Sequence, residues 1–239
     1  MKTKLSLDIT KEDFIARMKF EDDEEEERCR LYLGLKGVSY HTVLVNYIGL
    51  DEKDKIEYKK VKNLYVYDKR IRKILYKFLS ALEEGIRGYI SNNFCSDLSR
   101  IRKLSNPIYK SVIKGSSLSK ELENLDFKHL LNISKRMKKK DLVELFDNID
   151  HLKENLNAVK ELRNTVSHHR MLFVYDDFQE CFLNEGISGD SLIDNILNLR
   201  QLLNPFYKEF LIKEINDSST DEEDPQFEPS LPLKAILKL

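Results

Sequence analysis

Residues 61–94, VKNLYVYDKRIRKILYKFLSALEEGIRGYISNNF, carry the clearest structural signal in this chain. Apolar side chains recur there at steps of three and four residues, which is the spacing of one face of an α-helix. The members of this stripe are Leu64, Ile71, Leu75, Phe78, Leu82, Ile86 and Tyr89. Glu83 and Arg87 lie four residues apart, so they can pair along the same helix. We therefore predict one long helix over residues 61–94.

The composition of the whole chain also favours helices. Its 239 residues include only 8 Gly and 5 Pro, and they are rich in Leu, Ile, Lys and Glu. This length allows one large domain or two small ones. Besides 61–94, we expect helices at 10–20, 21–35, 39–48, 119–135, 141–149, 151–167 and, capped by Ser188, up to 215, with an irregular region at 95–117 and an extended piece at 173–175. The expected fold class is all-α.

We expect a soluble cytoplasmic protein with a disordered C-terminal segment. Residues 216–230 are polar, acidic and proline-containing, so we expect disorder there, while the apolar segment 231–239 could dock on the domain or on a neighbour. There is no run of 18 apolar residues and no signal-peptide core, which argues against a membrane protein. Cys29, Cys95 and Cys181 form no CxxC pair and fit free thiols in a reducing compartment.

Charge is distributed unevenly along the sequence. The net charge is −1, but residues 60–140 hold 20 Lys/Arg against 7 Asp/Glu, a net of +13, which leaves −14 for the rest. Such a basic centre fits a surface that binds a polyanion. Its densest part, Lys135–Lys140, is either an RNA-backbone patch or a solvated helix end. The acidic run 21–27 is either a solvated helix start, favoured by the helix dipole, or a regulatory segment.

A second helical pattern, residues 151–167, carries an arginine where an apolar residue is expected. Its apolar face is formed by Leu152, Leu156, Val159, Leu162 and Val166, and a rotation of about 100° per residue puts Arg163 in the middle of that face. An unpaired buried arginine would cost several kcal/mol. Either a carboxylate meets Arg163 in the core, with Glu83 or Glu84 as candidates, or this face lines a cleft or a subunit interface.

The pattern ends in the run Glu161-Leu-Arg-Asn-Thr-Val-Ser-His-His-Arg170, which suits phosphate chemistry. Arginine neutralises phosphoryl oxygens, and histidine moves protons near neutral pH. Asn164 and His168 share a helix face, whereas His168 would point about 140° away from Arg163 on an unbroken helix. Arg163 and His168 can therefore meet only if the helix ends near Ser167 or if a second copy of the chain supplies the partner.

The spacing Arg163-Asn164-x-x-x-His168, followed by His169 and Arg170, resembles the active-site signature of the HEPN superfamily, and more narrowly that of the Abi-like family of bacterial abortive-infection proteins. Three other stretches resemble segments of that family. Tyr65–Lys73 is similar to its aromatic-x-x-Asp-x-x-Leu-Arg stretch, and Ala81–Arg87 is similar to its Glu-x-x-x-Arg helix. Ser39–Tyr47 is similar to its N-terminal Tyr-rich segment. The resemblance covers about Val38 to Phe173. Ser167 departs from the family's usual Ala, and Gly85 and Gly88 interrupt the long helix, which we interpret as a close helix crossing.

The resemblance implies a dimeric HEPN-like helical bundle at 61–215, with additional N-terminal helices packed on it at 1–60 and an acidic tail at 216–239. It implies a metal-independent endoribonuclease that cleaves RNA in phage defence and needs no cofactor. Arg163 and His168 from both subunits would face one cleft, with Asn164 orienting the site and His169 beside it as a further catalytic candidate. Arg170 and the basic residues Lys135, Arg136, Lys138, Lys139 and Lys140 would bind the RNA, and a regulatory RNA or protein is a further expected partner.

Two other hypotheses fit the same residues. One is a non-catalytic HEPN-type protein that binds RNA or a partner protein through the same basic face, for example a toxin-neutralising component. The other is a purely structural helical module in which Arg163 satisfies a buried glutamate.

Overall fold

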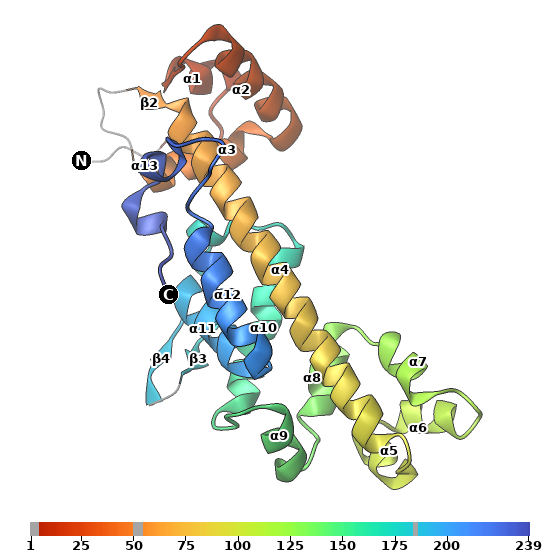
Figure 1. The fold of residues 1–239 in the computed structure, drawn as a ribbon. Helices are drawn as coiled ribbons and strands as arrows, with labels where there is room; N and C mark the ends of the chain where they lie inside the picture. The colour runs from red at the N-terminus through yellow and green to blue at the C-terminus, as the bar shows by residue number, and fades with distance from the viewer. Residues whose placement is uncertain (1–4, 50–54, 184–185) are drawn as a thin grey trace. The chain divides into compact units, whose positions relative to one another are not determined.

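The computed structural model describes residues 5–49, 55–183 and 186–239, and the described chain is mostly helical, which confirms the expected all-α class. The chain divides into two compact units. Figure 1 labels their helices and strands. Unit 1 comprises Met1–Arg72, Met171–Tyr175 and Ile215–Leu239. Unit 2 comprises Lys73–Arg170 and Asp176–Glu214.

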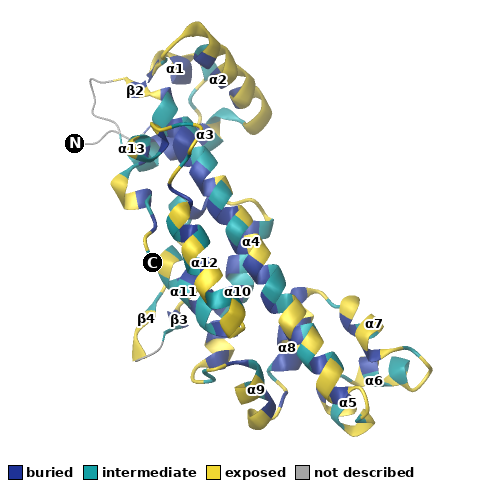
Figure 2. Ribbon diagram, in the orientation of Figure 1, coloured by how far each residue is buried: buried dark blue, intermediate teal, exposed yellow. Residues whose placement is uncertain are grey.

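Helix α4, Tyr58–Phe94, confirms the long helix predicted from the apolar stripe. Figure 2 shows a line of buried residues along it. Tyr89 is the exception among the stripe residues, because it is half-buried and its hydroxyl donates to Glu144 at 2.7 Å. The division between the units falls within α4, after Arg72, so one helix supplies core residues to both. They are Tyr58, Val61, Leu64, Tyr67 and Ile71 in unit 1, and Leu75, Phe78, Leu79, Leu82, Ile86, Ile90 and Phe94 in unit 2.

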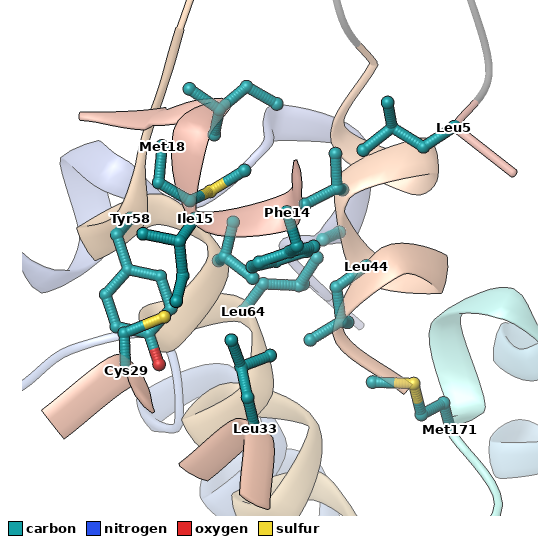
Figure 3. Packing of buried hydrophobic residues seen from close by; sticks show 14 residues of the cluster. Leu5, Phe14, Ile15, Met18, Cys29, Leu33, Leu44, Tyr58, Leu64 and Met171 are labelled. Atoms are coloured by element: carbon teal, nitrogen blue, oxygen red, sulfur yellow. The ribbon is translucent and has the colours of Figure 1, made fainter. Parts of the chain in front are cut away.

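Unit 1 surrounds the first turns of α4 with short helices. They are α1 (Lys11–Ala16), α2 (Asp23–Lys36), α3 (Val38–Ile48), the 3-10 turn η1 (Leu172–Val174), α13 (Phe227–Ser230) and the 3-10 turn η3 (Leu233–Ala235). Thr10 and Asp22 cap α1 and α2 by accepting hydrogen bonds from backbone N–H groups. The helix expected up to residue 20 ends at Ala16, because strand β1 (Met18–Lys19) pairs in parallel with β2 (Ile56–Glu57). Figure 3 shows the apolar side chains that pack between these elements.

The C-terminal segment of unit 1 is ordered in the structure, unlike the disorder expected for residues 216–230. The Arg70 guanidinium lies 4.3 Å from the Phe227 ring and donates to the carbonyl of Thr220 at 2.8 Å. The Leu237 N–H donates to the Tyr67 hydroxyl at 2.9 Å, so residues 231–239 dock on their own chain. Apolar residues spaced among the acids supply enough burial to order this segment: Phe227, Leu231, Ala235 and Leu237 are all buried.

Unit 2 combines the rest of α4 with a longer series of helices. They are α5 (Leu98–Leu104), α6 (Asn106–Val112), α7 (Leu118–Glu123), α8 (Phe127–Ser134), α9 (Lys139–Leu145), α10 (Leu152–Ser167), α11 (Leu192–Leu202) and α12 (Pro205–Asp217), the last of which continues into unit 1. A two-residue antiparallel pair, β3 (Cys181–Phe182) and β4 (Ser188–Gly189), completes the unit.

Local capping explains where unit 2 departs from the expected boundaries. The region 95–117, expected to be irregular, holds α5 and α6, because Asp97 and Ser105 each cap a helix. The helix expected at 119–135 is split because Asp126 caps a new helix, α8. The final helix starts after Ser191, not Ser188, where Ser191 and Asp194 form a capping box, and it is interrupted before α12. α9 ends at Leu145, short of the expected 149, and 172–174 form a 3-10 turn, not an extended piece.

Helix α10 is held in unit 2 by its apolar face and by one buried asparagine. The five apolar residues that predicted this face are all buried. Asn155 exchanges two hydrogen bonds with the backbone of Phe182, at 2.9 and 2.8 Å, and its carbonyl accepts from Asn198 at 3.0 Å. A buried polar side chain that is satisfied in this way fixes the rotation of a helix against its neighbours. The direction in which the opposite face of α10 points is therefore fixed as well.

No helix within the described residues is long and apolar enough to cross a membrane. Cys29, Cys95 and Cys181 are free thiols, of which only Cys95 is exposed. Burial raises the pKa of the Cys29 thiol to about 11 and that of the Cys181 thiol to about 12.

Replacing Gly85 by Ala should stabilise the chain by about 1 kcal/mol, because Gly85 is an exposed residue of α4 and an added Cβ meets no atom within 4 Å. Urea unfolding of the purified protein measures this. Gly115→Ala is the matched control, since its space is equally open but its φ of +102° strains an L-residue, so stability should fall. A loss of stability in Gly85→Ala would mean that another chain crosses α4 at this point.

Candidate active site

Helix α10 ends where the sequence predicted, just before the two histidines of the motif. The helix ends at Ser167, and the His168 N–H still donates to the carbonyl of Asn164 at 2.9 Å. The next residue, His169, has a left-handed backbone with φ of 55°. The Arg170 N–H then returns to the carbonyl of Thr165 at 3.1 Å, which closes the helix by a Schellman-type turn. Histidine is one of the few non-glycine residues enriched in this conformation.

The segment that follows the motif is anchored in unit 1 by Asp68. Its buried carboxylate accepts from the Leu172 N–H at 2.7 Å and from Arg72 Nε at 2.7 Å. Burial raises the pKa of Asp68, and the charge of Arg72 together with the backbone N–H groups of Leu172 and Phe173 opposes that rise. Asp68 and Arg72 are the aspartate and arginine of the Tyr65–Lys73 stretch, and their role in the structure is to hold this segment in unit 1.

Arg163 lies at a pocket on unit 2 instead of inside the core. The side chain is half-buried, and the pocket, of about 370 Å³, lies between the start of α8 and the last turns of α10. Its lining residues are Asp126, Phe127, Lys128, Lys160, Glu161, Arg163 and Asn164. Of the two alternatives that the sequence left open for Arg163, a carboxylate partner in the core or a face that lines a cleft, this position at a pocket fits the second. Its apolar neighbours on α10, Val159, Leu162 and Val166, are buried. A long arginine stem can reach past such neighbours to solvent.

Arg163 makes no hydrogen bond and no ion pair with any residue that the structure describes. Of its expected partners, Glu84 is exposed, and Glu83 pairs with Arg87 at 2.6 Å, as their four-residue spacing predicts. Arg87 also donates to the carbonyls of Leu122 and Leu125, at 3.0 and 2.6 Å. The hypothesis of a purely structural module, in which Arg163 satisfies a buried glutamate, is contradicted by this arrangement.

A carboxylate that the sequence interpretation did not use lies beside the motif. Glu161 accepts from Asn164 Nδ2 at 3.3 Å and pairs with Lys160 at 2.9 Å. Its pKa is lowered, because the hydrogen bonds from Lys160 and Asn164 and the charge of Arg170 outweigh the effect of burial. Glu161, the first residue of the run, therefore lies beside Asn164 in the lining of the pocket. The three-residue spacing of Glu161 and Asn164 was the available signal.

The structure brings only part of the motif to the pocket. Arg163 and Asn164 line it, whereas His168, His169 and Arg170 are exposed and lie outside the described lining. Because the His168 N–H continues the helical hydrogen bonds from Asn164, its Cα lies on the same face of α10 as Asn164.

The basic cluster Lys135–Lys140 is divided among three environments. Lys135 Nζ donates to Asn157 Oδ1 on α10 at 2.7 Å, and Arg136 donates to the carbonyl of Leu104 at 3.0 Å. Met137 is buried, while Lys138, Lys139 and Lys140 are exposed at the start of α9. Lys138, Lys139 and Lys140 lie at the N-terminus of α9, where the helix dipole is positive and disfavours cations. They therefore do not stabilise α9, as basic residues at a helix C-terminus would.

Sequence reasoning missed the basic residues Lys128, Lys153 and Lys160 around α10. Lys128 and Lys160 line the pocket with Arg163, and Lys153 lies two turns before Lys160 on the same helix. The signal was available for Lys153 and Lys160, because they share one helical face with Asn164. Lys128 comes from another helix, so only the tertiary structure could place it.

Comparisons of the chain with protein-family models, with curated proteins and with solved structures found no match. Among the residues that the structure describes, no group of three or more His, Cys, Asp or Glu side chains could hold a metal ion.

Replacing Arg163 by Ala should change the free energy of unfolding by less than about 1 kcal/mol, because no internal partner is left unpaired. Arg87→Ala is the matched control, since it strips Glu83 and two carbonyls of their donor and should cost about 2 kcal/mol or more. Parallel urea titrations of both variants measure the difference. An equal loss in Arg163→Ala would show that this guanidinium has an internal partner after all.

Proposed function

We propose that this chain is a metal-independent endoribonuclease of the abortive-infection type, with a HEPN-like helical bundle that acts as a homodimer. The observation that carries the proposal is the state of Arg163. It lies at a pocket beside Asn164, without a hydrogen bond or ion pair to any described residue, on the helix that ends in the exposed His168. An arginine left without a protein partner is available to an anionic ligand, and phosphate suits its planar set of donors.

The proposed reaction is an in-line attack within the RNA strand. His168 takes the proton from the ribose 2′-hydroxyl, with His169 beside it as a further candidate, and the new O2′–P bond forms while the P–O5′ bond breaks. The protonated histidine returns this proton to the leaving O5′, directly or through water, so the products are a 2′,3′-cyclic phosphate and a 5′-hydroxyl. Arg163 stabilises the charge that develops on the crowded phosphorus centre. Asn164, held by Glu161, orients the helix end, and Arg170 binds the flanking RNA backbone.

A two-fold dimer would bring these groups together. Arg163 and His168 leave α10 in different directions, and one helix aims them at a common point with difficulty. A two-fold interface repeats the same patch and places two copies of each residue around one cleft. In this proposal the protein acts in the cytoplasm in defence against phage, restrained by a regulatory RNA or protein.

One observation favours a second candidate, a non-catalytic RNA-binding or partner-binding protein of the same type, such as a toxin-neutralising component. His168 and His169 lie outside the described lining of the pocket that holds Arg163. In that case the basic residues would hold RNA, and no group would be placed to move the 2′-hydroxyl proton.

Replacing His168 by Ala should abolish RNA cleavage, by a factor of about 100 or more, while leaving folding and RNA binding unchanged. Gel analysis of a labelled RNA measures cleavage and identifies the cyclic phosphate end. His129→Ala is the control, because His129 is an exposed histidine outside the motif and should keep full activity. A DNA strand of the same sequence should resist, since it lacks the 2′-hydroxyl. Abolition of cleavage by EDTA would rule out the mechanism.

Mixing inactive Arg163→Ala and His168→Ala chains should restore about one quarter of the wild-type activity if each centre takes its arginine and its histidine from different subunits. The estimate follows because half of the randomly mixed dimers are hetero-dimers, each with one intact centre of two. Activity per chain should also fall on dilution. Sedimentation checks the oligomeric state, and full activity in a species that sediments as a monomer would exclude the dimer.

A further inference from the structure

The outward face of α10 carries a continuous polar stripe that leads to His168. Its members are separated by four, three, four and four residues, which keeps them on one side of the helix. Each of them is exposed or half-buried. We call this set the α10 stripe; its members are Lys153, Asn157, Lys160, Asn164 and His168.

Helix α8 and its C-terminal turn add two more cations along one side of this stripe. Lys135 reaches over to Asn157, with its Nζ 2.7 Å from Oδ1. Lys128, at the start of α8, lines the same pocket as Lys160 and Arg163. The seam between α8 and the α10 stripe is thus lined by five cationic side chains: Lys128, Lys135, Lys153, Lys160 and Arg163.

The carboxylates near this seam are already committed or lie at its margin. Glu161 is engaged by Lys160 and Asn164, and Asp126 caps α8 and pairs with His129 at 2.8 Å. Glu154 lies on α10 beside Lys153. Within the described part of the chain, Lys128, Lys153 and Arg163 have no carboxylate at ion-pair distance.

The pKa of Lys135 reflects the positive charges around it. Its pKa is lowered first by burial and then by the charges of Lys160 and Lys153, with Glu154 acting in the opposite direction. Like charges that are held together on a fixed helix face repel each other, and a bound polyanion removes that repulsion.

We propose that the α10 stripe, with Lys135 and Lys128 beside it, is the track along which a single RNA strand lies, its successive phosphodiesters bound by these lysines and one of them delivered to Arg163 and His168. This inference rests on the proposed function and specifies where the substrate runs. Lys153 to His168 spans about 22 Å along the helix, which is longer than one nucleotide, so the track holds several phosphates.

The test is a binding titration of the full chain with a single-stranded 2′-O-methyl RNA, which the proposed reaction does not cleave. The double variant Lys153→Gln/Lys160→Gln should bind more weakly, and the slope of log K against log salt should flatten by about 1.4, or about 0.7 per lost phosphate contact on a single strand. Lys110→Gln/Lys114→Gln is the matched control, because both residues are exposed in unit 2 and lie on and just after α6, away from the stripe.

Several outcomes would overturn the inference. One is an unchanged affinity and salt slope in the Lys153/Lys160 variant, and another is a loss confined to a Lys138→Gln/Lys139→Gln/Lys140→Gln variant, which would move the track to α9. Tighter binding of poly-glutamate than of the RNA would point to an acidic protein partner instead. Because the strand is uncleavable, stripe-dependent binding without any nuclease activity would refute the proposed function alone, and activity without stripe dependence would refute this inference alone.

Discussion

The apolar stripe of α4 is the constraint on which the rest of the structure depends. A 37-residue helix with a mostly polar surface owes its stability to the burial of one face and not to intrinsic propensity. In unit 1 that face is covered by α1, α2, α3 and the C-terminal segment, and in unit 2 it contributes to the core shared with the later helices. The polar residues of α4 are then placed by the same rotation. Asp68 falls inside unit 1, where it holds the segment after the motif.

The two faces of α10 carry opposite energetic roles. The inner face is stabilised by buried apolar residues and by the hydrogen bonds of Asn155, whereas Lys153 and Lys160 on the outer face lie close enough to Lys135 for their charges to lower its pKa. Self-repulsion on the outer face and the left-handed backbone of His169 both cost free energy. The packing of the inner face offsets these costs.

Much of the fold could be predicted because its signals are local. The 3.6-residue period of the α4 and α10 stripes and the end of α10 at Ser167 were readable from sequence. The end of α1 at Ala16 could not be read from the sequence, because it depends on the pairing of Met18 with Ile56, 38 residues away. The environment of Arg163 could not be predicted either, because the start of α8, which is distant in sequence, lines the same pocket. The tail was misjudged because its acidic composition outweighed its few, well-spaced apolar residues.

The assembly of unit 1 from distant segments has a consequence for the order of folding. Its core contains Phe14 and Leu64 but also Met171 and Ala235, and the hydrogen bond between Tyr67 and Leu237 spans 170 residues. At about 5–20 residues per second, a ribosome needs on the order of 10 to 30 s to synthesise that interval. Unit 1 is therefore begun first during translation and completed last. Until then its apolar N-terminal helices are exposed to chaperones or to neighbouring nascent chains, and closure of so long a loop slows the final step.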